Sequence, residues 1–300
     1  MGTGRSPNNV GTEYRPQPIL GGMTQTRRRA SLLMLMPWCL SGQMTDEATW
    51  RKFLEWVPTV PPSDNPGNLL RQFQMHLVKS GASEAEAASS QAVVMKMMKV
   101  SPDGWQTIFN RIYASKTPGF STRPNALLVS AVEGRAPGRA PGRSLDVGMG
   151  QGRNSVFLAL RGWEATGFDV SDEGLAVARR NAEAAGVRIN AVRKSNVEFD
   201  FGAAQWDLIV ITYEPFPVTD SRYVARIAQA LKPGGMVVIE SFASDAAAVV
   251  RKPVDIDPGE LLSAFQSGFR ILHFEDTMAV PDWDPAKTRL VRLVAEKRTR

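Results

Sequence analysis

The chain has 300 residues, 43% of them hydrophobic, and carries a formal net charge of +6 at pH 7. This apolar content is enough for one large domain or two ordinary ones, and it excludes a disordered composition. The single cysteine, Cys39, excludes an intramolecular disulfide and a cysteine-rich metal site. His76 and His273 have no partner at metal-ligand spacing, so we expect no bound metal.

The excess positive charge does not predict a nucleic-acid partner. Residues 1–45 contain five arginines and one glutamate, so most of the excess lies in a terminal stretch. The other basic clusters fall at residues 135–143 and 297–300, in a predicted linker and at the chain's end. Nucleic-acid sites need basic side chains gathered on one folded face. We therefore expect no nucleic-acid binding.

Residues 1–43 are predicted to form a disordered tail. Residues 1–22 are rich in Gly, Pro, Asn, Thr and Arg and have no apolar period. Three arginines at 27–29 and an apolar run at 30–40 then have the layout of a secretory signal, with Met23 as an alternative start. The run is shorter than the about 20 residues that span a bilayer, so we expect no transmembrane helix. An amphipathic or buried N-terminal helix is the alternative.

Residues 44–133 are predicted to form a helical cap. Apolar side chains recur at helical spacing within residues 50–57, 69–77, 93–98 and 105–113. Ser83, followed three residues later by Glu86, predicts a capping box at the start of a helix over residues 83–100. Residues 134–143 then repeat a Gly-Arg-Ala-Pro unit, which indicates an exposed, flexible linker.

Residues 144–300 alternate strands and helices, as in a doubly wound, Rossmann-like α/β sheet of about seven strands. The predicted strands are residues 144–148, 164–170, 189–194, 206–212, 236–242, 269–280 and 290–296. The predicted helices are residues 154–161, 173–185 and 222–231, and residues 232–235 are predicted to turn. The unbroken apolar run at 206–212 is typical of a strand that is covered on both faces.

Three glycines alternate where the first strand runs into the first helix, at Gly148, Gly150 and Gly152. Glycine lets the backbone approach a ligand closely, and a helix N-terminus offers it unpaired N–H groups. We therefore expect a ligand at this turn. The spacing departs from the dinucleotide fingerprint G-x-G-x-x-G, because the third glycine comes one residue early and Arg153 stands where that fingerprint has glycine.

The pattern Asp-x-Gly-x-Gly-x-Gly over residues 146–152 resembles motif I of class I S-adenosylmethionine-dependent methyltransferases. Its extension Gly-Gln-Gly-Arg-Asn-Ser, residues 150–155, resembles the small-molecule branch that includes the tellurite-resistance methyltransferases. The resemblance covers roughly the second half of the chain. It implies S-adenosylmethionine as cofactor, a small-molecule acceptor, and a sheet whose last strand is antiparallel. Because this cofactor is made in the cytosol, it favours a cytoplasmic protein over an exported one.

The resemblance also implies a set of cofactor-binding residues: Asp146, Gly148, Gly150, Gly152, Arg153, Asn154, Asp169, Asn196, Val197 and Thr212. Asp169 closes the second strand, where an acid accepts hydrogen bonds from ribose hydroxyls; its alternative role is to cap the next helix, which Ser171 can do instead. Asp146 lies inside an apolar strand and needs a cation or donors, which the cofactor's amino group supplies. Asn196 stands where the family has an acid that contacts adenine.

The residues after the fourth strand are expected to face the transferred methyl group. Tyr213 and Glu214 are the candidate bases, needed only if the acceptor binds protonated, and packing or capping is their alternative role. In the segment before the glycine turn, Phe120 and Asn125 are candidate substrate contacts, with packing of the last cap helix as the alternative.

Two other functions remain open from the sequence. One is a nicotinamide-dependent oxidoreductase, which the glycine spacing disfavours. The other is a non-catalytic ligand-binding or interaction protein with the same fold, because a fold does not establish turnover. The attacking atom of the acceptor and the oligomeric state are not predicted.

Overall fold

The computed structural model describes residues 45–62, 66–101, 103–115, 120–134, 140–244, 255–282 and 286–299. The predicted tail with its signal-like segment and most of the predicted linker lie outside these residues. The described cap and sheet belong to one compact unit, residues 44–300.

Four helices form the N-terminal part of this unit, as predicted: α1 (Asp46–Trp56), α2 (Pro66–Lys79), α3 (Glu84–Val100) and α4 (Gly104–Tyr113), with a short 3-10 turn η1 (Val57–Thr59) after α1. Phe53 and Phe73 are fully buried between them and meet edge to face, with ring centroids 5.2 Å apart. The capping box of α3 is present, since Ser83 Oγ accepts from the Glu86 N–H at 3.2 Å and the Glu86 carboxylate accepts from the Ser83 N–H at 2.8 Å.

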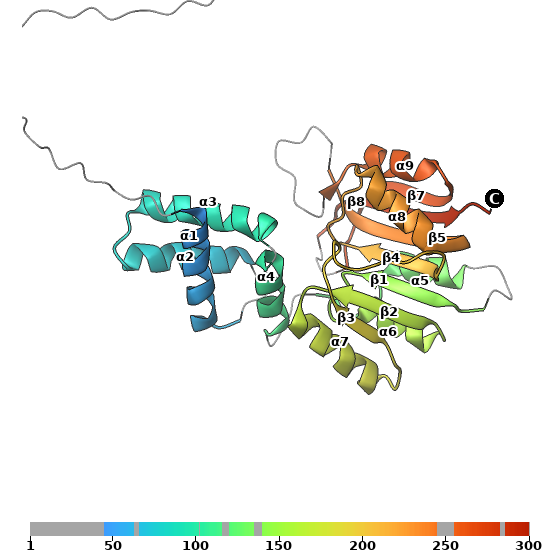
Figure 1. The fold of residues 1–300 in the computed structure, drawn as a ribbon, viewed down its shortest axis with the longest axis horizontal. Coiled ribbons are helices and arrows are strands. Elements are labelled where there is room, and N and C mark those ends of the chain that lie inside the picture. Colours follow the sequence, from blue (N-terminus) through green and yellow to red (C-terminus); the bar gives the residue numbers. More distant parts are fainter. Residues whose placement is uncertain are drawn as a thin grey trace, which may run out of the picture. The chain divides into compact units, whose positions relative to one another are not determined.

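The rest of the unit is a mixed sheet with the strand order β3-β2-β1-β4-β5-β8-β7 (Figure 1). The strands are β1 (Arg143–Val147), β2 (Glu164–Asp169), β3 (Asn190–Arg193), β4 (Trp206–Thr212), β5 (Leu231–Ala243), β7 (Phe269–Ala279) and β8 (Thr288–Lys297); the two-residue β6 (Asp255–Ile256) pairs with β5 alone. The last strand, β8, runs antiparallel to both of its neighbours. The predicted sheet is therefore confirmed, including the antiparallel last strand.

Helices cover both faces of the sheet: α5 (Ala126–Glu133), α6 (Arg153–Leu160), α7 (Asp172–Ala184), α8 (Ser221–Ala230) and α9 (Pro258–Gln266). Successive β4 residues point to opposite faces. Val210 packs in one cluster with Leu128 of α5, and Ile209 packs in another with Ile227 of α8 and Leu261 of α9. This double cover explains why the sequence of β4 is apolar throughout.

Two differences from the predicted elements concern α9 and β5. The sequence analysis missed α9, although Asp257 caps it by accepting from the Glu260 N–H at 2.9 Å and Pro258 occupies its first turn. The second difference is that β5 begins at Leu231, so it includes residues 232–235, which were predicted to turn. Its pairing with β4 passes from Trp206↔Leu231 to Leu208↔Met236, so these residues form an irregularity inside the strand.

No helix among the described residues combines the length and the apolar character that crossing a membrane requires.

Candidate active site

A cavity of about 680 Å³ opens at the carboxyl ends of β1, β2, β3 and β4. This edge of a doubly wound sheet is where such folds bind ligands. The glycine turn and the residues that follow β2, β3 and β4 form its inner side, while Trp105, Phe109 and Tyr113 of α4 line it from the cap. Of the predicted site residues, all but Asp146, Gly152 and Asn125 line this cavity.

The glycine turn needs glycine at each of its three positions. Gly148, Gly150 and Gly152 have φ values of 66°, 51° and 78°, in the left-handed region that side chains disfavour. A Cβ on Gly148 would collide with the Glu214 carboxylate, and one on Gly150 with the Tyr113 hydroxyl. The first two glycines line the cavity, and the Glu214 carboxylate and the Tyr113 hydroxyl lie against them. Gly152 serves packing instead, because its Cβ would lie 2.8 Å from the Ala178 Cβ.

Asp169 is held at the end of β2 by backbone donors. Its carboxylate accepts from the Gly150 N–H and from the Ser171 N–H, each at 2.8 Å. The Ser171 hydroxyl, not Asp169, caps α7 by accepting from the Gly174 N–H at 2.9 Å. Burial raises the pKa of Asp169 above its ordinary value. Asp169 thus lines the cavity and is not needed as the helix cap, as the sequence analysis expected.

Asp146 lies in β1 and does not reach the cavity. Its carboxylate accepts from the Ser155 hydroxyl at 2.8 Å, and only 2% of the residue is exposed. Burial raises its pKa to about 6, although Ser155 and the nearby Arg153 oppose the shift. The structure therefore gives Asp146 a partner within the protein, where the sequence analysis had invoked the cofactor's amino group.

Glu214 follows β4 and turns back over the glycine turn. Its carboxylate accepts from the Asn196 side-chain amide at 2.9 Å and lies against Gly148. Burial is the main reason that its pKa rises to about 8, and the charges of Asp169 and Asp146 raise it further. At this turn the protein thus gathers three acids whose charges are costly in the absence of a cation.

Asn196 is more heavily engaged within the protein than predicted. Its amide nitrogen also donates to the Pro215 carbonyl at 3.1 Å, and its oxygen accepts from the Tyr223 hydroxyl at 2.8 Å. It thus braces the segment that carries Glu214, which adds a structural role to the expected adenine contact. Its neighbour Val197 lines the cavity with 88% of its surface exposed.

The surroundings of Tyr213 make it a poor general base. Its hydroxyl donates to the buried Glu240 carboxylate at 2.6 Å, and its backbone takes a positive φ of 56°. Burial and the charge of Glu240 raise the pKa of Tyr213 far above its ordinary value. A phenolate at this position is therefore strongly disfavoured, and Glu214 is the better candidate base.

Asn125 joins several segments beside the cavity and does not line it. Its side-chain nitrogen donates to Glu240 at 2.7 Å and to Asp282 at 2.9 Å, and its oxygen caps α5 at the Leu128 N–H. These contacts use all of the amide's donors, so the predicted contact with substrate has no support from the geometry. Phe120, in contrast, lines the cavity next to Tyr113, with ring centroids 5.2 Å apart.

Three further contacts, made by two residues, fix the start of α6. Arg153 forms an ion pair with Asp282, with 2.6 Å between the nitrogen and the carboxylate oxygen. Asn154 accepts from the Asn125 N–H at 2.9 Å and donates to the Thr212 hydroxyl at 3.0 Å. The glycine turn, the segment before it and the end of β4 are thereby tied together.

Sequence reasoning missed Glu240, Asp282, Arg292 and the aromatic residues of α4. Glu240 gave a usable signal, because it is an acid within the apolar stretch at 236–242, as Asp146 is within β1. The contributions of Asp282 and of α4 depend on how distant segments meet, which no local pattern shows.

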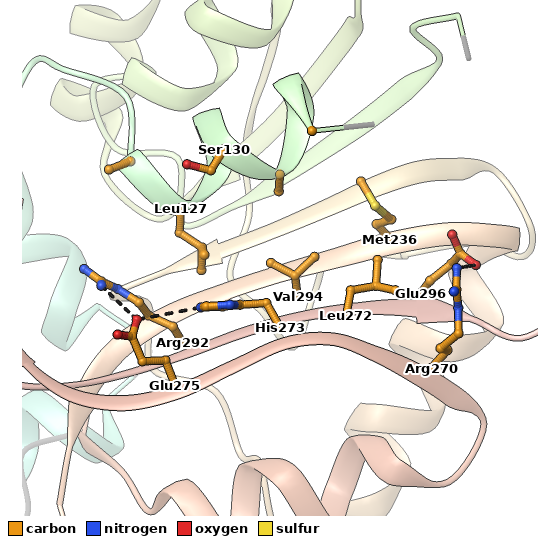
Figure 2. Close-up of a pocket in the computed structure, with 13 residues that line it drawn as sticks. Leu127, Ser130, Met236, Arg270, Leu272, His273, Glu275, Arg292, Val294 and Glu296 are labelled. Atoms are coloured by element: carbon orange, nitrogen blue, oxygen red, sulfur yellow. Dashed lines mark hydrogen bonds and ion pairs between the residues drawn. The ribbon is translucent and has the colours of Figure 1, made fainter. Parts of the chain in front are cut away.

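A second cavity, of about 580 Å³, lies between α5 and the strands β7 and β8. Figure 2 shows Arg292, Glu275 and His273 pointing toward one another at one end, and Arg270 with Glu296 at the other. Arg292 connects this groove to the buried network, because its Nε donates to Glu240 at 2.6 Å. Within the described part of the chain, no group of three or more His, Cys, Asp or Glu residues could hold a metal ion.

Comparisons with known proteins agree with this fold and site. Residues 145–235 match the family described as a methyltransferase domain. They include the glycine turn, Asp169, Asn196 and Glu214. This segment is therefore similar to a methyltransferase domain, and the strand order with its antiparallel last strand is the one that the resemblance to class I S-adenosylmethionine-dependent methyltransferases implied.

The curated relatives that the chain matches include ubiquinone biosynthesis O-methyltransferases. That of Cronobacter sakazakii is 35% identical over 126 residues, which are 41% of this chain and 52% of the relative. That of Shewanella pealeana is 33% identical over 118 residues, or 38% and 49% of the two chains. The chain spans about half the length of these curated relatives.

Among solved structures, one from work on the conversion of a disulfide bond into a thioacetal group during echinomycin biosynthesis has a TM-score of 0.51. It is 19% identical and covers 64% of this chain and 93% of its own, a likeness that concerns the fold alone. TehB from Haemophilus influenzae is 18% identical, with 64% and 67% covered and a TM-score of 0.49. These values are too low to assign a branch, so the resemblance to the tellurite-resistance branch stays a prediction.

The residues present fit S-adenosylmethionine. Gly148 and Gly150 line the cavity without side chains of their own, and the Asp169 carboxylate in the same lining can accept from ribose hydroxyls. The acids Asp146, Asp169 and Glu214 make the turn favourable for a ligand with cationic sulfonium and ammonium groups.

Proposed function

We propose that the protein transfers a methyl group from S-adenosylmethionine to a small-molecule acceptor. The observation that carries this proposal is the convergence of the glycine turn, Asp169 and Glu214 on one cavity at the carboxyl ends of the strands. Under this proposal Gly148, Gly150, Asp169, Asn196, Val197 and Thr212 contact the cofactor. Arg153 and Asn154 hold the start of α6 beside it.

The protein's main contribution is alignment. The cofactor supplies an electrophilic methyl group, so no nucleophilic residue is needed, and positioning of two reactants can be worth about 7–11 kcal/mol. The cap residues Trp105 and Phe109 line the cavity opposite the strand ends, which suits a small acceptor enclosed with the cofactor. Phe120 is the candidate substrate contact from the segment before the glycine turn.

Glu214 is the proposed general base if the acceptor binds protonated. It lines the cavity, and its pKa of about 8 lies near neutral pH, where proton transfer is most effective. Tyr213 is set aside as a base, since its hydroxyl proton is held by Glu240. A Glu214→Gln variant that keeps full turnover would remove the assignment.

A hydroxyl is the first acceptor group to test, because the curated relatives are O-methyltransferases. The purified chain is incubated with methyl-labelled S-adenosylmethionine and a panel of phenols and catechols, thiols, amines and metalloid oxyanions. The proposal predicts label in one of these classes, lost in the Gly150→Ala variant. If no class gains label although the cofactor binds, a non-catalytic binding protein becomes the better account.

We propose that the reaction takes place in the cytoplasm, where the cofactor is made. Immunoblotting of fractionated cells, with sequencing of the N-terminus of the mature chain, tests this. An intact Met1 or Met23 in the cytosolic fraction supports it, whereas a chain cleaved near residue 42 and found outside the cytosol contradicts it.

A further inference from the structure

Glu214 occupies an unusual position for a charged side chain. It is half-buried, it lies against the backbone of Gly148, and it accepts a hydrogen bond from a neutral amide, that of Asn196. Its carboxylate faces the cavity at the turn where the cofactor is proposed to bind. The ligand and Glu214 must therefore share this space.

The groups around Glu214 are acids and phenols on four elements. Asp146 of β1 and Asp169 of β2 act on its charge, and its own charge acts on Tyr113 of α4 and Tyr223 of α8. Arg153 of α6 acts on Asp146 and is paired with Asp282, and Arg226 of α8 acts on Tyr223. Lys99 and Lys194 also line the cavity, but the charges that act on Glu214 are those of Asp169 and Asp146, and this like charge favours its protonated form.

We propose that Glu214 releases its proton when S-adenosylmethionine binds, and that cofactor binding thereby creates the carboxylate that accepts the proton of the methyl acceptor. This inference rests on the proposed methyltransferase function. Its physical basis is that a sulfonium beside Glu214 would bring positive charge next to a carboxylate whose hydrogen-bond partner is a neutral amide. A cation within about 4–6 Å favours the ionised form of a carboxyl group.

The proton balance closes over one cycle. On cofactor binding, the Glu214 proton goes to solvent. During transfer, a lone pair of the acceptor atom forms the bond to the methyl carbon, the C–S electron pair stays on sulfur, and the acceptor's proton moves to Glu214. The product S-adenosylhomocysteine has a neutral sulfur, so Glu214 keeps that proton in the product complex. The Glu214 carboxylate is thus ionised and able to accept a proton while the methyl donor is bound, and it is protonated again after the transfer.

The test is calorimetric titration at pH 7 in two buffers of different ionisation enthalpy, which gives the number of protons released per cofactor bound. With a pKa of about 8, about nine-tenths of Glu214 is protonated at pH 7 in the free protein. We expect S-adenosylmethionine to release close to one proton and S-adenosylhomocysteine to release few. Both carry the same type of amino group, so their difference isolates the sulfonium.

Two variants sharpen the result. Glu214→Gln removes the titrating group, and the difference between the two cofactors should disappear. Glu198→Gln is the matched control, because Glu198 lines the same cavity but Ser195 lowers its pKa, so it is already ionised and should release no proton. The comparison of the two cofactors on the unaltered chain stands even if a variant does not fold.

Equal proton release with both cofactors, or undiminished release in Glu214→Gln, would overturn the inference while leaving the proposed function in place. An absence of S-adenosylmethionine binding would instead overturn the proposed function, and this inference with it.

Discussion

Three carboxyl groups near the glycine turn are treated differently by their surroundings. Asp169 is held by two backbone N–H groups, Asp146 by the Ser155 hydroxyl, and Glu214 by the amide of Asn196. The pKa of each is raised, and that of Glu214 rises to about 8. Fewer donors leave the charge of a buried acid more costly.

The ligand-free protein should lose stability as Glu214 ionises. Its pKa is higher in the folded state, about 8, than in the unfolded state, so folding retains a proton that is lost as pH rises toward 8. Between pH 6.5 and 8.5 the unaltered chain should lose about 2 kcal/mol more unfolding free energy than Glu214→Gln. Urea denaturation at the two pH values measures this, and parallel losses in both proteins would contradict the assigned pKa.

The glycine turn allows a matched pair of variants. Gly150 and Gly186 both have positive φ, 51° and 67°, but a Cβ on Gly150 would collide with the Tyr113 hydroxyl, while Gly186 has nothing within 4 Å. Alanine at either position should cost roughly 1–2 kcal/mol of stability for the backbone conformation. Only Gly150→Ala should also lose cofactor affinity, by at least about tenfold. Calorimetric titration of both variants with the cofactor checks this. An equal loss of cofactor affinity in the two variants would show that backbone strain alone explains the loss in Gly150→Ala.

At the residue scale, most of the residues predicted from motif spacing line the cavity, but their hydrogen-bond partners could not be predicted. The turn glycines, Asp169 and Glu214 follow strand ends, and strand ends in a parallel sheet meet at one edge. The engagement of Asn125 by Glu240 and Asp282 joins residues more than a hundred positions apart. No local pattern carries that information, so the sequence left Asn125 as a candidate substrate contact with packing of the last cap helix as the alternative.

At the scale of elements, one buried carboxylate ties several segments together. Glu240 of β5, 1% exposed, accepts from Tyr213 after β4, from Asn125 before α5 and from Arg292 of β8. Such a network is costly to break, because removing one member leaves buried donors and a cation without their partner.

Glu240→Ala should therefore lower the unfolding free energy by about 3–5 kcal/mol. The control is Glu275→Ala, which removes the other acid paired with Arg292; its side chain is 39% exposed, so the loss should stay within about 1 kcal/mol. Chemical denaturation of both variants at one pH decides the matter. If Glu240→Ala and Glu275→Ala lowered the unfolding free energy by similar amounts, the buried network would not be a major source of stability.

Periodicity predicted the elements well where one pattern runs uninterrupted. The cap helices, β4 and the capping box at Ser83 follow directly from apolar spacing and end signals. Residues 231–243 and 255–266 were harder. A turn-like Lys-Pro-Gly-Gly stretch lies inside β5, so the sequence there favours a turn where the structure has a strand. The helix α9 is only nine residues long, so its apolar period is too short to be distinctive.

At the scale of the whole molecule, the cap and the sheet both contribute residues to the same cavity. Asn110 of α4 accepts from the Ser171 hydroxyl at 2.8 Å, next to Asp169, while Trp105 and Phe109 line the cavity from the same helix. The N-terminal helices are therefore expected to take part in ligand binding as well as to cover the sheet. The alternation of strands and helices in the sequence predicted the sheet topology. The contribution of α4 to the cavity could be recognised only in the folded structure.

The central claim is that the cavity at the glycine turn binds S-adenosylmethionine. Calorimetric titration of the purified chain with S-adenosylmethionine and, separately, with NAD tests it most directly. The account predicts saturable binding of one S-adenosylmethionine per chain, weakened in Gly150→Ala, and no binding of NAD at the same concentrations. Binding of NAD without S-adenosylmethionine, or binding of neither, would contradict it.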